Sequence, residues 1–338
     1  MSERLVVYTE RAEGPVPGLD EDLIVHNGGT VLYGEAASEE DRLRMAERAE
    51  IIISGGARLT RGFFAALPNL KGVVRLGIGV DNVDVGAATD LGIVVANVPE
   101  FCSDEVAEHA LGLMFAVARK IVLADRRARA GEWVRGMDAV LLPMRRLRGQ
   151  TMGLIGFGKI ARSMAHKAQG LGLRVIAFDP YYSAEQAQAA GVTLMSLEQL
   201  LPQTDILSLH VPGTPETKGL INTRTLALLK PGAILINTAR GMVVDEAALC
   251  AALASGRLAG AGLDLLQQEP LRLPHPLTKF ENVVFTCHYA SLGNESYASM
   301  RRQVSDQAVQ ILRGEFPTNF VNPQVKDLPQ CRLRKGNG

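Results

Sequence analysis

The chain has 338 residues, which is more than one hydrophobic core usually serves and therefore predicts two domains. Lys plus Arg and Asp plus Glu each number 36, and this balance argues against nucleic-acid and anionic-membrane partners. The sequence has no apolar run of about 20 residues, no signal-like start and no paired Cys spacing, so we expect a cytoplasmic protein without a membrane span, disulfide framework or metal site.

Short β-branched runs alternate with longer amphipathic runs, which is typical of a parallel α/β fold. In the first hundred residues the predicted strands are Leu5–Tyr8, Leu23–His26, Ile51–Ser54, Val73–Leu76 and Ile93–Ala96. Helices are predicted over Ser38–Ala49, Thr60–Leu67 and Ser103–Arg119. Ser103 is the expected N-cap of the third helix, because Asp104 and Glu105 then lie in its first turn, where the helix dipole favours anions.

A second series of strands follows Arg148. Its predicted strands are Met152–Ile155, Arg174–Phe178, Ile206–His210, Ala233–Asn237, Gly260–Leu265 and Val283–Thr286. Several are apolar on both faces, which suits a parallel sheet covered by helices on both sides. A closing helix is predicted over Ala298–Arg313, and residues 326–338 are expected to form a loose tail. The predicted fold class is α/β, with two Rossmann-like doubly wound parallel-sheet domains.

A glycine-rich loop follows the first strand of the second series. Gly156 permits a tight turn, Gly158 lets the backbone approach a pyrophosphate, and Ala161 allows close packing of the helix on the strand. Asp179 lies 179 − 158 = 21 residues further on, at the end of the next strand. An Asp at this place accepts hydrogen bonds from both ribose hydroxyls and repels a 2′-phosphate. The motif therefore predicts NAD in preference to NADP.

A second glycine loop, Gly77 to Asn82, also follows a strand. Asn82 stands at the third glycine position and Asp81 would repel a pyrophosphate, so we interpret the loop as lining a substrate cleft. Its N–H groups would then bind a small carboxylate. On the motif alone, a plain strand-to-helix turn is the more common alternative.

Arg240, Glu269 and His288 each lie close to the end of a predicted strand in the second series. Ligands bind beyond the carboxyl ends of strands in open α/β sheets, so the three side chains can face one crevice. Arg orients a carboxylate and polarises a ketone, His donates a proton to the developing alkoxide, and Glu holds the imidazolium. Each residue taken alone also fits an ordinary role, as a surface Arg, a turn Glu or a satisfied core His.

Seven ordered segments resemble the D-isomer-specific 2-hydroxyacid dehydrogenase family. They are RLGIGVDNVDV (75–85), VPEFCSDEVAEHALGL (98–113), MGLIGFGKIARSMA (152–165), SLHVPGTPETKGLIN (208–222), LKPGAILINTARGMVVDEAAL (229–249), LDLLQQEP (263–270) and TCHYAS (286–291). In order and spacing the resemblance covers roughly residues 50–322. It is strongest to the branch that includes phosphoglycerate dehydrogenase-like enzymes and the C-terminal-binding-protein corepressors.

The resemblance implies a discontinuous substrate-binding domain, residues 1–101 plus 290–325, an NAD-binding domain, residues 102–289, and a cleft between them. It also implies a homodimer joined through the NAD domains. The implied catalytic residues are Arg240, Glu269 and His288. The expected cofactor-binding residues are Gly156, Phe157, Gly158, Lys159, Ile160, Asp179, His210, Val211, Pro212, Thr217, Thr238, Ala239, Asp264, His288 and Ala290. The expected substrate-binding residues are Ile78, Gly79, Phe101, Arg240 and Ser291.

Three positions depart from the family pattern. Cys287 replaces the usual Pro before the catalytic His, Phe101 stands where lactate-type members have Tyr, and Ser291 stands where the corepressor branch has Trp. The predicted function is an NAD-dependent oxidoreductase that transfers hydride between nicotinamide and C2 of a small D-2-hydroxy or 2-oxo acid. The alternative is an NAD(H)-sensing, corepressor-like binding protein. Glu269 argues against a formate-type enzyme, which carries Gln there.

Overall fold

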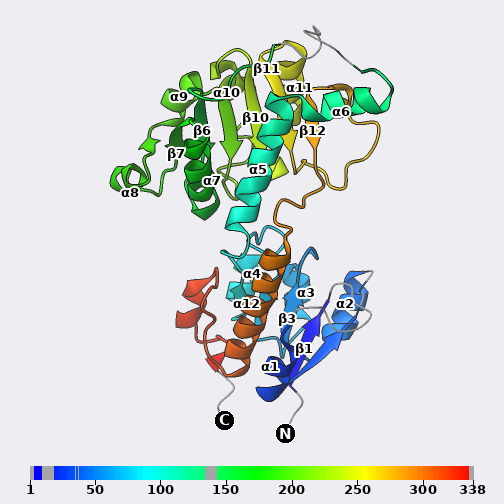
Figure 1. The fold of residues 1–338 in the computed structure, drawn as a ribbon. Helices are drawn as coiled ribbons and strands as arrows, with labels where there is room; N and C mark the ends of the chain where they lie inside the picture. The colour runs from blue at the N-terminus through cyan, green and yellow to red at the C-terminus, as the bar shows by residue number, and fades with distance from the viewer. Residues whose placement is uncertain (1–3, 10–18, 35, 37, 134–142, 335–338) are drawn as a thin grey trace. The chain divides into compact units, whose positions relative to one another are not determined.

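The computed structural model describes residues 4–9, 19–34, 36, 38–133 and 143–334 of the chain. The chain divides into two units, one formed by Met1–Phe101 with Gly293–Gly338 and the other by Cys102–Leu292. Each unit contains one parallel sheet with helices packed against it (Figure 1). The predicted class, two parallel-sheet α/β domains, is therefore confirmed.

Unit 1 has five strands in the order β2-β1-β3-β4-β5, and every neighbouring pair is parallel. This is the flavodoxin-like 2-1-3-4-5 order of doubly wound sheets. The strands are β1 (Arg4–Tyr8), β2 (Gly29–Tyr33), β3 (Ala49–Ser54), β4 (Gly72–Arg75) and β5 (Val94–Ala96). The helices are α1 (Glu21–His26), α2 (Glu39–Ala46), α3 (Arg61–Ala65), α4 (Val85–Asp90) and α12 (Asn294–Leu312).

Unit 2 has seven parallel strands in the order β12-β11-β10-β9-β6-β7-β8. Numbered from β6, this is the 3-2-1-4-5-6 order of dinucleotide-binding domains with one strand added at the edge. The strands are β6 (Thr151–Ile155), β7 (Arg174–Phe178), β8 (Thr193–Leu194), β9 (Ile206–Leu209), β10 (Ala233–Asn237), β11 (Leu258–Leu263) and β12 (Val283–Phe285). The strand order reverses between β6 and β9, which is where this fold binds its ligands.

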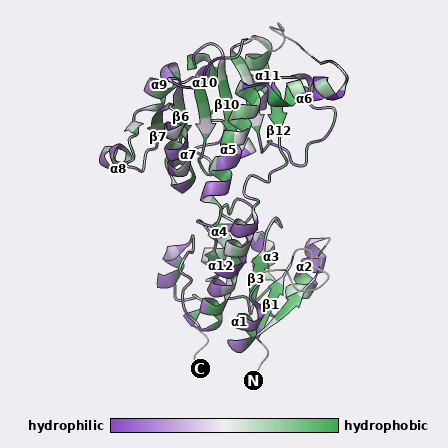
Figure 2. Cartoon of the chain, viewed as in Figure 1, coloured by the Kyte–Doolittle hydropathy of each residue, from purple (hydrophilic) through white to green (hydrophobic). Residues whose placement is uncertain are grey.

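The helices of unit 2 cover both faces of its sheet. They are α5 (Ser103–Ala118), α6 (Ile121–Arg129), α7 (Lys159–Gly170), α8 (Ala184–Ala189), α9 (Leu197–Leu200), α10 (Thr223–Leu228) and α11 (Glu246–Ala254). Short 3₁₀ helices occur at Leu201–Gln203, Gly241–Val243 and Pro276–Lys279 in unit 2 and at Pro323–Asp327 in unit 1. On β10, Ile234 and Ile236 join the core beneath α5 and α7, and Leu235 joins the opposite core. This two-sided burial explains why the strands are apolar throughout (Figure 2).

The predicted strand Leu23–His26 is wrong, because these residues lie in helix α1. The Asp20 carboxylate accepts a hydrogen bond from the Leu23 N–H at 2.8 Å, and Glu21 and Asp22 occupy the first turn. The same apolar residues would also suit a strand. The N-cap and the acids in the first turn favour the helix. The missed strand β2 begins after the turn at Gly28.

Three smaller expectations are corrected as well. Ser103 is the first residue of α5, whose N-cap is Cys102, so it does not cap the helix. Helix α2 ends at Ala46 because β3 begins at Ala49. The expected loose tail is packed as far as Leu333, since Cys331 and Leu333 are buried and the Arg332 side chain donates to the carbonyls of residues 67 and 70. Residues 335–338 of the predicted tail lie outside the described residues.

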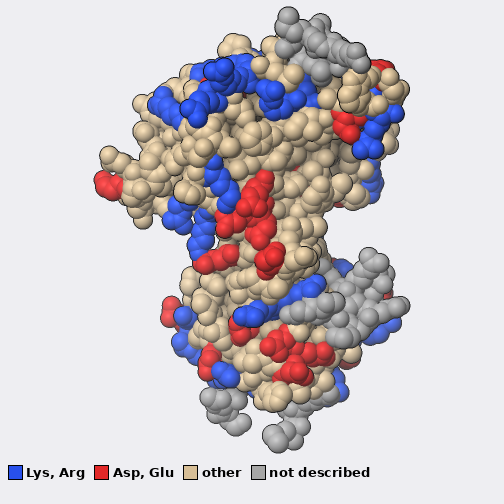
Figure 3. Space-filling model, in the orientation of Figure 1, with Lys and Arg blue, Asp and Glu red and all other residues tan. Residues whose placement is uncertain are grey.

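Both signs of charge occur on the visible face of each unit, where blue and red side chains form separate groups (Figure 3). Among the residues that the structure describes, no helix combines the length and the apolar character needed to cross a bilayer.

Asp205, just before β9, is a buried acid that ties three segments of unit 2 together. Its carboxylate is 3% exposed and lies 2.9 Å from an Arg145 guanidinium nitrogen and 2.8 Å from Lys230 Nζ. It also accepts the Thr151 N–H at 3.0 Å. Burial by itself would raise the pKa of Asp205, but the hydrogen bonds and charges of Lys230, Thr151 and Arg145 hold this pKa below its usual value.

We predict that Asp205→Asn lowers the free energy of unfolding by about 2–3 kcal/mol at pH 7, because it leaves two cations without their shared anion. A carboxyl whose folded-state pKa is lowered contributes stability above its unfolded pKa of about 4 and loses it as pH falls through the folded-state value. The difference between wild type and variant should therefore shrink below about pH 4. Urea unfolding followed by circular dichroism at several pH values measures it.

The control is Asp90→Asn, which removes an exposed partner of Arg61. We expect it to leave the unfolding transition nearly unchanged, because exposed ion pairs contribute little. A difference between wild type and Asp205→Asn that stays constant with pH would contradict the assignment.

Candidate active site

The turn from β6 into α7 has the shape of a phosphate-binding loop. Gly156 has φ +90°, and a Cβ added there would lie 2.6 Å from the His210 carbonyl oxygen. No described atom lies within 4 Å of a Cβ placed on Gly158, so the space before the helix is open. No side chain caps α7, and the N–H groups of its first turn, which begins at Lys159 and Ile160, are oriented for an anion.

Asp179, after β7, is held by the same loop. Its carboxylate accepts the Phe157 N–H at 2.7 Å and the Tyr181 N–H at 2.8 Å. The Tyr182 ring packs edge-on against Phe157, with a centroid distance of 5.7 Å. Two backbone donors therefore fix the carboxylate at the carboxyl end of β7, and its remaining lone pairs are available to a diol.

The loops after β9 and β10, on the other side of the point where the strand order reverses, contain buried polar atoms without a hydrogen-bond partner among the described residues. His210 Nδ1 and Thr238 Oγ1 are buried and have no hydrogen-bond partner among the residues that the structure describes. His210 Nε2 lies 2.9 Å from Ser208 Oγ, and burial lowers the pKa of His210 to about 4. The ring is therefore neutral at pH 7, and a bound ligand would satisfy the unpaired atoms.

These features fit a dinucleotide. A glycine turn without room for a side chain, an open helix start, a fixed acid and orphaned polar atoms all lie at the carboxyl ends of neighbouring strands. Val211 follows β9 beside Gly156. Thr217 is different, because its hydroxyl bonds within its own loop, to the carbonyls of Pro212 and Thr214.

His288 and Glu269 are brought together although 19 residues separate them. His288 Nδ1 lies 2.6 Å from Glu269 Oε2, and the other Glu269 oxygen accepts the Leu266 N–H at 3.1 Å. His288 has φ +55°, a left-handed conformation that costs a non-glycine residue about 1–2 kcal/mol. The pair therefore fixes Nδ1 and leaves Nε2 as the nitrogen that can exchange a proton with a ligand.

Arg240 follows β10, and its turn lies directly against the Glu269 loop. The buried Asn237 amide binds both sides of this turn, donating to the Arg240 carbonyl and accepting the Ala239 N–H, each at 3.0 Å. A Cβ on Gly241 would lie 1.9 Å from the Leu266 carbonyl oxygen. The Arg240 guanidinium donates to the Ala239 carbonyl at 2.7 Å. The backbones that carry Arg240 and Glu269 are therefore in contact.

Asp264, at the end of β11, is 3% exposed and binds the turn that carries His288. Its carboxylate accepts the N–H groups of Tyr289 at 3.1 Å and Ala290 at 3.0 Å and the Thr286 hydroxyl at 2.6 Å. Its backbone carbonyl accepts the His288 N–H at 2.8 Å. Asp264, one of the expected cofactor-binding residues, therefore anchors the turn that carries His288.

The predicted substrate residues Ile78, Gly79 and Phe101 belong to unit 1, whereas Arg240 and Ser291 belong to unit 2. In unit 1 the Asn97 amide donates to the Ile78 carbonyl at 2.6 Å. The Asn82 amide donates to the carbonyls of Gly55 and Ala57, which joins the loops after β3 and β4. Phe101 is 8% exposed. Substrate binding by these residues stays a prediction.

Four residues that shape this site were not singled out from the sequence: His109, Asn237, Gly241 and Thr286. Asn237 and Gly241 flank Arg240, so their proximity to a candidate residue is a usable signal. Thr286 lies two residues before His288 and has the same signal. His109 has no such signal, since its contacts depend on the packing of α5 against β11.

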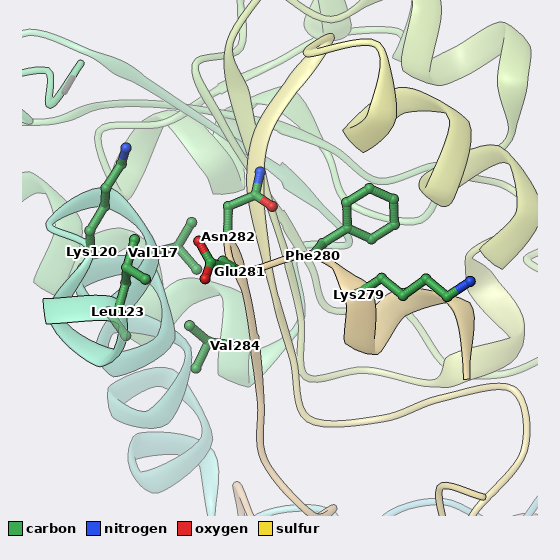
Figure 4. A pocket seen from close by; sticks show the side chains of 9 residues that line it. Val117, Lys120, Leu123, Lys279, Phe280, Glu281, Asn282 and Val284 are labelled. Atoms are coloured by element: carbon green, nitrogen blue, oxygen red, sulfur yellow. The ribbon is translucent and has the colours of Figure 1, made fainter. Parts of the chain in front are cut away.

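A pocket of about 300 Å³ lies elsewhere in unit 2 (Figure 4). Val117, Leu123 and Val284 supply apolar lining from α5, α6 and β12, and Lys120 and Glu281 add charges. None of its lining residues is a predicted site residue, so we do not assign it to the reaction.

The sequence profile of "D-isomer specific 2-hydroxyacid dehydrogenase, NAD binding domain" matches residues 111–290, which is more than half of the chain. The chain belongs to this family. A glyoxylate reductase of Korarchaeum cryptofilum is 40% identical over 262 residues, covering 78% of this chain and 79% of that protein. The match assigns the chain to a family of NAD-dependent oxidoreductases, as the sequence predicts.

A D-3-phosphoglycerate dehydrogenase of Archaeoglobus fulgidus is 38% identical over 302 residues, or 89% of this chain. The match spans only 56% of that longer relative. Among solved structures, an NADPH-dependent glyoxylate/hydroxypyruvate reductase of Sinorhizobium meliloti, bound to NADP and malonate, superimposes with a TM-score of 0.81. It is 29% identical, and the match covers 98% of each chain.

We predict that Gly241→Ala lowers kcat/KM for the family's NAD-dependent oxidation or reduction about 100-fold. The added methyl must push the Arg240 turn away from the Glu269 loop. The control is Gly170→Ala, at the end of α7, where no described atom lies within 4 Å of the new carbon. Steady-state kinetics of both variants measure the effect. Equal activities of the two variants would show that contact between the two loops is not needed.

Proposed function

We propose that this enzyme transfers hydride between the nicotinamide of NAD and C2 of a small D-2-hydroxy acid or its 2-oxo acid. The observation that carries the proposal is the His288–Glu269 hydrogen bond of 2.6 Å, beside the Arg240 turn and at the carboxyl ends of the dinucleotide-type sheet. When bound, the cofactor supplies or accepts the hydride. The chain itself must orient the acid and move one proton.

Arg240 is suited to the substrate's carboxylate and ketone oxygen, because a planar guanidinium donates two parallel hydrogen bonds. In the reducing direction His288 donates its Nε2 proton to the oxygen that becomes the hydroxyl. In oxidation the same nitrogen accepts that proton. Glu269 holds Nδ1 through its hydrogen bond and so orients the ring, with Nε2 toward the substrate oxygen.

The expected cofactor set would hold the dinucleotide along β6, β7 and β9. Gly156, Gly158 and the start of α7 would receive the pyrophosphate, and Asp179 the adenosine ribose. The unpaired atoms of His210 and Thr238 would receive polar groups of the cofactor. Ile78 and Gly79 would supply backbone donors for the substrate carboxylate.

We predict turnover of NADH with at least one acid from a panel of glyoxylate, hydroxypyruvate, pyruvate and larger 2-oxo acids. His288→Gln should lower kcat by a factor of about 10²–10⁴, because a neutral amide cannot supply the proton. Binding of NADH, followed by fluorescence, should be retained in that variant. Absorbance at the NADH maximum reports the rate.

Failure of the wild-type, NADH-binding protein to turn over any acid of the panel would refute the enzyme proposal. Nothing in the comparisons favours the corepressor-like alternative. The same fluorescence titration shows whether a silent enzyme still binds the dinucleotide.

The preference for NAD over NADP rests on Asp179, whose charge would lie beside a 2′-phosphate. We predict that Asp179→Asn lowers kcat/KM with NADH and raises it with NADPH, so that the ratio of the two falls at least about tenfold. Asn keeps one oxygen for the Phe157 N–H. Kinetics with each cofactor measure the ratio, and an unchanged ratio would show that Asp179 does not select the cofactor.

Three further expectations remain part of the proposal. Unit 2 serves as the NAD-binding domain and unit 1 as the substrate-binding domain. The protein is a homodimer joined through unit 2, as the family resemblance implies. The mass of the assembly in solution tests this. A reducing cytoplasmic location suits the four free cysteines.

A further inference from the structure

Helix α5 lies unusually close to β11. A Cβ on Gly262 would lie 2.9 Å from Leu113 Cβ, and a Cβ on Gly260 would lie 2.7 Å from Val117 Cγ1. His109, Leu113 and Val117 are four residues apart and share one face of the helix, and residues 264, 262 and 260 share one face of the strand. The two glycines therefore bring His109 to the level of Asp264, where its Nε2 lies 3.8 Å from Asp264 Oδ1.

A chain of hydrogen bonds links His109 to this carboxylate. The Thr286 hydroxyl donates its proton to Asp264 Oδ1 at 2.6 Å. His109 Nε2 lies 3.0 Å from the same hydroxyl oxygen, which can then only accept. His109 Nε2 must therefore carry a hydrogen and donate it to Thr286. The bonds run in one direction, from the ring through the hydroxyl to the carboxylate.

His109 also contacts the other end of the turn that carries His288. Its ring packs edge-on against the Tyr289 ring, with a centroid distance of 5.1 Å. Thr286 and Tyr289 flank Cys287 and His288, so His109 contacts a residue on each side of this pair, and Asp264 binds the backbone of the turn. The turn is therefore held at both ends by His109 of α5 and by Asp264, which follows β11.

Apart from the Glu269 hydrogen bond, the orientation of His288 depends on this turn. Its side chain is 53% exposed, so few other neighbours restrain the ring, and its backbone is in the left-handed conformation. We propose that His109 and Thr286 are positioning residues that hold the His288 turn through Asp264 and so aim the imidazole for proton transfer. The proposal rests on the proposed function, in which His288 exchanges that proton.

The test removes each donor while keeping its shape. Thr286→Val and His109→Phe should each lower kcat for 2-oxo acid reduction by NADH about tenfold, with the KM for NADH changed less than about twofold, because a misaimed imidazole slows chemistry without weakening cofactor binding. The double variant should lose little more than either single variant, since both act through Asp264.

Conservative variants and a matched control separate positioning from loss of fold. Thr286→Ser keeps the hydroxyl and His109→Gln keeps an N–H near the position of Nε2, so both should recover most of kcat. His166→Phe makes the same exchange at an exposed histidine on α7 and should behave as wild type. A fall in kcat with Thr286→Ser equal to that with Thr286→Val would overturn the hydroxyl's role.

Amide hydrogen exchange, measured by mass spectrometry, tests whether the turn is held without relying on enzyme activity. The amides of residues 288–290 should exchange about tenfold faster in Thr286→Val and His109→Phe, whereas peptides from β6 should be unchanged. Unchanged exchange overturns the proposal. Faster exchange with wild-type kcat also overturns it, because the turn would then be held without serving the reaction. If the wild type reduces no 2-oxo acid, the proposed function fails, and the exchange result alone decides whether these residues hold the turn.

Discussion

The carboxylate of Asp264 occupies a place where several segments of unit 2 meet. It directly follows β11, its backbone N–H donates to the Asn237 carbonyl at the end of β10, and its oxygens bind the turn after β12. A buried carboxylate with unsatisfied lone pairs would be costly, so three donors around it make a self-consistent arrangement. Because His288 lies within that arrangement in a strained backbone conformation, the geometry of the proton-exchanging nitrogen depends on it.

The site is assembled from loops, but rigid elements determine where each loop begins. Parallel strands release their loops at one edge of the sheet, and the close contact at Gly241 fixes the distance between the loops of Arg240 and Glu269. The Asn237 amide makes two hydrogen bonds to backbone groups next to it, and the Glu269 carboxylate makes one. The exposed side chains that would meet the substrate therefore stand on a backbone with little freedom.

The α/β class, most of the strands and the glycine loops can be predicted from the amino-acid sequence alone, since runs of β-branched residues and glycine turns are local signals. Leu23–His26 shows the limit, because its three apolar residues, which precede a histidine, suit a strand and a short helix equally. The capping hydrogen bond that the Asp20 carboxylate accepts favours the helix. Arg240, Glu269 and His288 could be nominated because each follows a strand. The contacts of Thr286 and His109 could not be predicted in this way. They depend on the packing of α5 against β11 and on the left-handed backbone of His288, which determines where the N–H groups of the turn point.

The bare backbone at Gly260 and Gly262 has a consequence for how variants of this protein are interpreted. A methyl group at either position would push against the C-terminal half of α5, and the displacement would reach the middle of the helix, where His109 lies. Such a substitution lies outside the expected substrate and cofactor sites, yet a mutational scan scored by enzyme activity would place it among the active-site variants. The contact with α5 thus limits which residues β11 can carry at these two positions. Substitutions in the buried sheet can therefore lower activity although they lie away from the site.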